Sequence, residues 1–160
     1  MTYDRPAQFA WTRVWIPIGA TIFLLALLIS ALVVPELRLL HFLQALIYLA
    51  IIILARRNSA LGFGAGVSVP VAWNSLNLFV THLMQAGTLE LWNLLHTGQV
   101  RRPDTMMVPL AGIGHFILII ACLAAFFGLK PDLKKWGNFV GGGVAALAYL
   151  ILIVVTTAPR

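Results

Sequence analysis

The sequence has little charge and a single cysteine. Of its 160 residues, 10% are charged and 61% are hydrophobic, and the mean hydropathy is +0.94. A soluble domain of this size leaves too much surface exposed to hide so many apolar side chains. One cysteine, Cys122, excludes an intrachain disulfide and a CxxC metal or redox motif. The composition therefore predicts an integral membrane protein.

Acidic residues are especially scarce, and none lies inside a long apolar run. Their absence removes the usual residue for coupling transport to protons or sodium. The 11 Lys and Arg residues form short clusters between the runs, as they do at the membrane edges of multi-pass proteins, so we expect no nucleic-acid partner. Neither a nucleophile elbow nor a metal-ligand motif accompanies Ser75 and His82. We therefore expect no catalytic residue and no metal site, and a stand-alone enzyme is the less favoured class.

Five apolar runs have the length of a membrane span, since a hydrocarbon core of about 30 Å needs about 20 apolar residues in a helix. The first run is too long for the apolar part of a signal peptide and is followed by no clear cleavage site. We predict an all-α, polytopic integral membrane helix bundle that forms a single domain over residues 1–160. Its transmembrane helices are expected at about 14–34, 37–55, 60–86, 106–129 and 136–157.

The third run, 60–86, is the most polar of the five. It opens with three glycines and carries Pro70, so a re-entrant or interfacial segment is the rival interpretation. That alternative leaves four spans, and with a cytoplasmic N-terminus it would export the lysines at 130–135. Because a lysine cluster in a short loop favours retention in the cytoplasm, we favour five spans.

A short amphipathic segment follows the third run at about 88–97. Leu91, Leu94 and Leu95 share one face, with Trp92 at its edge. This pattern predicts a helix that lies in the membrane interface. Elsewhere, Gly62-x-x-x-Gly66 and Gly137-x-x-x-Gly141 are small-residue motifs that favour close contact between helices.

Basic residues are unequally divided between the two ends of a five-span bundle. The positive-inside rule then places the N-terminus in the cytoplasm and the C-terminus outside, in a multi-pass protein of the cell membrane. The expected cytoplasmic residues are Arg5, Arg13, Arg56, Arg57, Lys130, Lys134 and Lys135, against Arg38, Arg101, Arg102 and Arg160 outside.

Polar residues within the spans predict a pocket in the outer half of the membrane. Drawn as a continuous helix, the third run gathers its polar side chains within an arc of about 160°. His115 has no strongly polar neighbour on its own stripe, so its partner must come from another helix or a ligand. We expect His82 and His115 to face a common cavity, with His41 at its edge. The candidate cofactor-binding residues are His41, Gln44, His82, Gln85 and His115, and the candidate ligand-pocket residues are Tyr48, Asn74, Asn77 and Thr81.

Three functional interpretations stay open for this pocket. In the first, its polar groups only join helices, and the chain is an accessory subunit. In the second, the pocket holds haem b, with His41 and His115 as axial ligands, or a quinone, with His82 bonded to a carbonyl and Gln85 or Gln44 in support. In the third, Asn74, Asn77, Thr81 and His82 line a transporter or sensor.

The predicted function is a small subunit of a membrane complex, linked to redox chemistry through haem or quinone. The alternative is a stand-alone transporter or sensor for a small neutral ligand. The expected partners are the lipid bilayer and either other membrane subunits or further copies of the chain.

Overall fold

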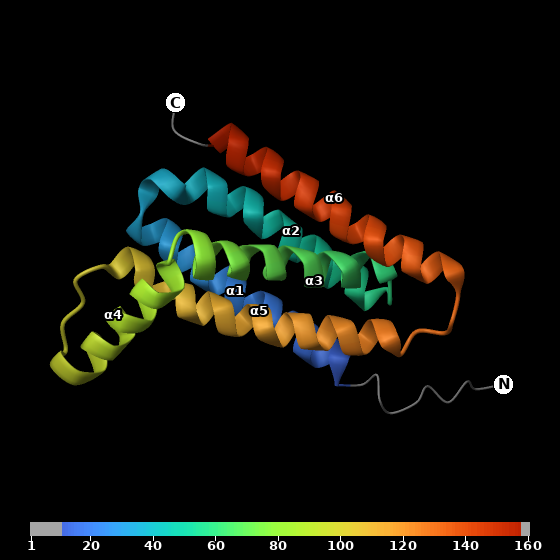
Figure 1. The fold of residues 1–160 in the computed structure, drawn as a ribbon, viewed down its shortest axis with the longest axis horizontal. Helices are drawn as coiled ribbons and strands as arrows, with labels where there is room; N and C mark the ends of the chain where they lie inside the picture. The colour runs from blue at the N-terminus through green and yellow to red at the C-terminus, as the bar shows by residue number, and fades with distance from the viewer. Residues whose placement is uncertain (1–10, 158–160) are drawn as a thin grey trace.

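The computed structural model describes residues 11–157, and every regular element in that range is helical (Figure 1). Five helices are long and apolar enough to cross a membrane, as predicted. A sixth, shorter helix, α4, follows the third of them. The elements are α1 (Thr12–Val33), η2 (Pro35–Leu37) running into α2 (Arg38–Arg56), α3 (Ala60–Ser75) running into the π-helical turn η3 (Leu76–Val80), α4 (Leu83–Thr97), α5 (Pro103–Phe127) and α6 (Leu133–Thr157).

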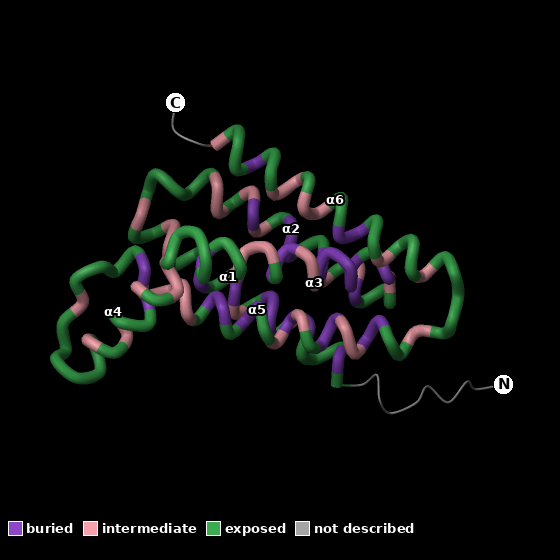
Figure 2. The backbone as a smooth tube through the Cα atoms, in the orientation of Figure 1, coloured by how far each residue is buried: buried purple, intermediate pink, exposed green. Residues whose placement is uncertain are grey.

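The core lies where α1, α2, α3 and α5 meet. The main contacts join α1 to α5 and α3 to α6, and α3 also packs on α5 and α2. Fully buried large side chains come from all four core helices and include Phe23, Tyr48, Phe63 and Leu118. Figure 2 shows the buried segments concentrated along these helices, while α4 and most of α6 are exposed. An exposed apolar surface of this kind suits a bundle surrounded by lipid.

Glycines allow α6 to approach α3 closely. These glycines are not the two of the predicted Gly137-x-x-x-Gly141 motif. A Cβ on Gly142 would collide with the backbone of Leu61, and one on Gly64 would collide with the carbonyl of Phe139. Gly137 has nothing within 4 Å of such a Cβ, and Gly141 has only one atom, at 4.0 Å. The predicted Gly137-x-x-x-Gly141 contact is therefore wrong, because neighbouring Gly142 and Gly143 occupy the helix face that meets α3.

The third span is shorter than predicted. It ends at Val80 rather than at residue 86, because the chain leaves the α-helix through a π turn and then adopts a left-handed conformation at His82, with φ of 56°. The next helix, α4, begins at Leu83, five residues before the expected start of the amphipathic segment. The helical arc drawn from a continuous 60–86 span therefore does not apply beyond Leu76.

Helix α4 projects from one end of the bundle and packs against α5 (Figure 1). Gly87 allows the contact, since a Cβ there would strike the Thr105 carbonyl and Pro109. Leu89, Trp92 and Leu95 are exposed on α4, while Glu90 is buried and accepts a hydrogen bond from the Arg101 backbone N–H at 2.8 Å. Location of α4 in the membrane interface stays a prediction.

We expect Gly142→Ala to destabilise the bundle by about 1–3 kcal/mol, because its Cβ must push α6 away from the Leu61 backbone. Gly137→Ala is the matched control on the same helix. It should be neutral or stabilising by up to about 1 kcal/mol, since it adds helix propensity in open space. Unfolding of both variants in detergent checks the difference, and equal stability would contradict the packing described for α6.

Candidate functional site

His115 of α5 lies at the centre of the bundle, with none of its surface exposed. Its Nε2 is 2.6 Å from the Tyr48 hydroxyl oxygen of α2, and its Nδ1 is 3.2 Å from Asn74 Oδ1 of α3. The expectation that His115 is partnered from another helix is therefore confirmed. The His115 side chain therefore joins three helices, α2, α3 and α5, through hydrogen bonds in the buried core.

The two bonds fix the protonation of the ring. Asn74 Oδ1 can only accept, so the Nδ1 of His115 carries the hydrogen and donates it. In a neutral ring, Nε2 is then the acceptor, and the Tyr48 hydroxyl donates to it. The hydrogen bonds thus run in one direction from Tyr48 through His115 to Asn74. The buried amide nitrogen of Asn74 has no partner among residues 11–157.

Aromatic rings enclose the same imidazole. Phe23 of α1 stacks on His115 with ring centroids 4.1 Å apart, and the edge of Trp73 of α3 meets it at 4.9 Å. Phe23 also stacks on Tyr48 at 4.2 Å. Sequence analysis missed Phe23 and Trp73, because an aromatic residue in an apolar run carries no local signal of its partner. With both nitrogens bonded and its face covered, His115 has no nitrogen free for a haem iron, so the structure does not support the expected His41–His115 axial pair.

A cavity of about 590 Å³ lies beside this cluster, on the other side of Phe23 and Trp73. It occupies the half of the bundle that contains the ends of α1 and α3 and the starts of α2 and α5. The second half of α6 forms one wall, with Leu150, Ile151, Val154 and Val155. Most of the lining is apolar. The polar lining residues are Ser30, His41, Gln44, Asn77, Thr81 and Asp104.

The structure divides the predicted site residues into three groups. His41, Gln44, Asn77 and Thr81 line the cavity. Tyr48, Asn74 and His115 form the hydrogen-bonded cluster next to it. His82 and Gln85 lie at the break between η3 and α4, where both are exposed.

The expectation that His82 and His115 face one cavity is wrong. His82 is the left-handed residue at which the helix breaks, and its exposed position separates it from the buried His115 cluster. Gln85 lies at the same helix break, where its amide donates a hydrogen bond to the Leu78 carbonyl at 2.8 Å. Thr81 bonds the Leu76 carbonyl at 3.4 Å. The Leu76 carbonyl also accepts the Thr81 backbone N–H at 2.9 Å, so both side chains add hydrogen bonds at the end of the helix.

Asn77 and His41 differ in how their polar atoms are satisfied. The amide of Asn77 donates to the Trp73 carbonyl one turn earlier, at 2.9 Å. The buried Nδ1 of His41 has no hydrogen-bond partner in the part of the chain that the structure describes. An imidazole in apolar surroundings needs partners for both nitrogens. His41 is therefore the cavity residue best suited to complete its hydrogen bonding with a bound molecule.

No protein-family model, curated protein or solved structure matches this chain. Pockets for small molecules commonly enclose about 300–1,000 Å³ and combine apolar walls with a few polar groups. The cavity has this size and composition. Its walls suit a molecule that dissolves in lipid, and its polar groups suit one that carries oxygen atoms.

We expect Tyr48→Phe to destabilise the protein by about 1–2 kcal/mol, because it keeps the ring against Phe23 but leaves Nε2 of His115 without a donor. Tyr149→Phe is the control, since it removes a longer bond of 3.4 Å from a half-buried hydroxyl. Thermal unfolding in detergent measures both. Loss of the same stability from the two variants would contradict a special role for the Tyr48–His115 bond.

Proposed function

We propose that this chain is a five-helix membrane protein that binds a neutral, lipid-soluble molecule of the quinone type in the 590 Å³ cavity. The observation that carries the proposal is the cavity itself, with apolar walls from five helices and a small polar set at one end. A quinone ring offers carbonyl oxygens as acceptors. The imidazole of His41 and the amide of Gln44 can donate to them from neighbouring turns of α2.

The position of the cavity supports a ligand that arrives from the bilayer. Ile151, Val154 and Val155 of α6 line it and are themselves exposed on the outside of the bundle. Leu76 at the start of η3 is likewise exposed. The cavity therefore meets the surface between apolar helices, where an isoprenoid or alkyl tail can remain in lipid. Membership of a larger redox complex stays a prediction.

Filling the cavity tests the proposal directly. Ala72 lines it, and Ala72→Leu should weaken quinone binding by about tenfold or more, because the added carbons occupy the ligand's space. The matched control is Ala148→Leu, on the exposed surface of α6, which should stay within about twofold of the wild type. The measurement is a titration of the purified protein with a short-chain quinone, in which quenching of tryptophan fluorescence reports binding. Unchanged binding by Ala72→Leu would refute the cavity as the site.

Recognition of the quinone head is tested by His41→Phe, which keeps a ring but removes the nitrogens. Loss of one hydrogen bond should weaken binding by about fivefold to tenfold. An alkylbenzene of the same tail length should bind weakly to wild type and no worse to the variant. Equal affinity of the two ligands for wild type would mean that the cavity recognises apolar bulk alone.

We further propose that the N-terminal end of α1 faces the cytoplasm of a cell. Among the described residues, this end of the bundle carries more basic side chains than the other. They are Arg13, Arg56, Arg57, Lys130, Lys134 and Lys135, against Arg38, Arg101 and Arg102, while Arg5 and Arg160 lie outside the described range. The cavity would then open toward the outer half of the membrane.

Cysteine labelling of intact cells checks this orientation, and buried Cys122 gives little background. A membrane-impermeant maleimide should label Gln99→Cys, in the exposed turn after α4, but not Asp132→Cys, between α5 and α6, until the cells are permeabilised. The reverse pattern would overturn the orientation and leave the quinone proposal standing.

A further inference from the structure

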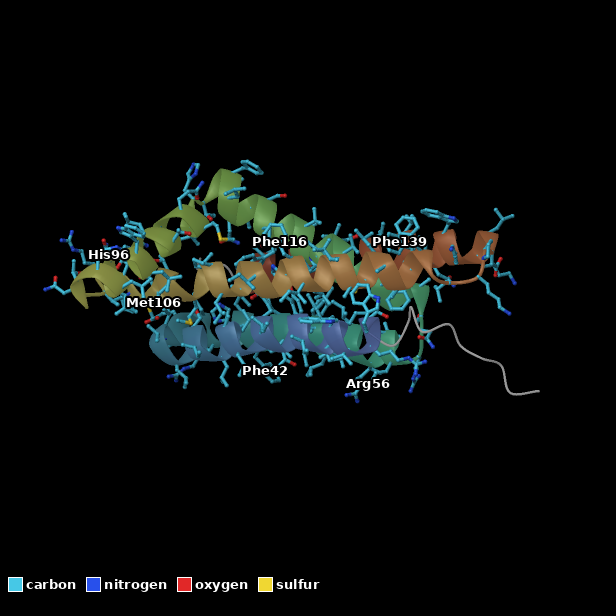
Figure 3. All side chains as sticks on the ribbon, turned by 90° about the horizontal axis from the view of Figure 1, so that it is seen from below. Phe42, Arg56, His96, Met106, Phe116 and Phe139 are labelled. Carbon is cyan, nitrogen blue, oxygen red and sulfur yellow. The ribbon has the colours of Figure 1, made fainter. Side chains whose placement is uncertain are left out.

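A second cavity, of about 220 Å³, lies at the end of the bundle where α1 begins. Two arginines line it, Arg13 in the first turn of α1 and Arg56 in the last turn of α2. Asn58 in the turn that follows α2 contributes a third polar group. Figure 3 shows Arg56 at the opposite end of the bundle from Met106 and His96. The described residues that line this cavity and those that line the quinone cavity do not overlap.

The charge of this cavity is uncompensated within the described chain. No Asp or Glu is among its described lining residues, and the ion pair recorded within residues 11–157 joins Arg102 to Asp104 at the other end. Both arginines are exposed. Two guanidinium groups that share a cavity with no carboxylate among its described lining residues attract an anion, and their planar N–H donors match the oxygens of a phosphate.

Two helix starts add to the positive potential. Arg13 lies in the first turn of α1, and Phe63 lies in the first turn of α3, whose N-cap residue Ser59 makes no side-chain cap hydrogen bond. The amide groups of a first turn point outward and carry partial positive charge. The last turn of α2 lines the same cavity and presents the negative end of its dipole there, so the net positive charge of the cavity comes from the two arginines.

The inner wall of the cavity is apolar. Ile16, Pro17, Ile52 and Phe63 lie below the arginines, on helices that run on into the membrane-spanning part of the bundle. A free anion gains nothing from such a wall. A lipid gains from both parts, because its phosphate meets the arginines while its acyl chain covers the apolar side chains. Basic pockets between membrane helices recognise anionic head groups in this way.

We propose that this cavity binds the phosphate group of an anionic membrane lipid, held by Arg13 and Arg56. The site is independent of the quinone proposal, since it uses other residues at the other end of the bundle. Failure of one site therefore leaves the other untouched.

The test is retention of lipid by the purified protein in neutral detergent, measured by native mass spectrometry. One phosphatidylglycerol molecule should stay bound to the wild type in preference to phosphatidylcholine. The double variant Arg13→Gln/Arg56→Gln should weaken that binding by about tenfold or more. Arg57→Gln/Lys134→Gln is the matched control. It removes the same charge from exposed positions at the same end and should change binding by about twofold or less.

Three outcomes would overturn the proposal. Equal retention of phosphatidylcholine by the wild type would show no preference for a net negative head group, a result that needs no variant to fold. Equal weakening by the two double variants would show diffuse attraction to a basic surface. Displacement of the lipid by free glycerol phosphate at the same concentration would show that a soluble anion, rather than a lipid, is the occupant.

Discussion

A polar group inside hydrocarbon must find its hydrogen-bond partner within the protein, because lipid tails offer none. This constraint explains most of the polar geometry of the bundle. His115 is bonded on both nitrogens, by Tyr48 and by Asn74. Where the third candidate span ends, the Gln85 amide donates to the Leu78 carbonyl, and the Thr81 hydroxyl and backbone N–H both donate to the Leu76 carbonyl. His41 and the amide nitrogen of Asn74 are the exceptions among the described residues, and of the two only His41 lines the cavity.

The number of spans could be predicted because apolar length is a property of the sequence itself. The end of the third span could not, since the polar residues from Asn74 to Gln85 fit either one polar helix face or a helix break. The π turn and the left-handed conformation of His82 show that the helix breaks here. Of the two glycine motifs, Gly62-x-x-x-Gly66 does make close helix contacts, and Gly137-x-x-x-Gly141 failed for a related reason. Spacing identifies small residues that could meet another helix, but the rotation of α6 determines that Gly142 does so and Gly137 does not.

The predicted site residues do not share one place in the structure. Tyr48 and Asn74 were expected to face a ligand, yet they bond His115, because the nearest buried imidazole satisfies them first. Four other predicted residues, His41, Gln44, Asn77 and Thr81, do line a cavity. Phe23 and Trp73 separate the two groups, and no sequence pattern distinguishes an aromatic ring that makes such a partition from one that faces lipid.

The tight seam between α3 and α6 near Gly142 has a mechanical consequence. The seam lies in the first half of α6, whereas the cavity wall formed by Leu150, Ile151, Val154 and Val155 lies in its second half. Figure 1 shows α6 running obliquely away from α3 toward its C-terminal end. A rotation of α6 about Gly142 would therefore move the second half of the helix relative to the cavity. Val155 lies about 20 Å along the helix, so a tilt of about 5° moves that wall by about 2 Å. The width of the cavity is thus set by the angle at which one pair of helices crosses.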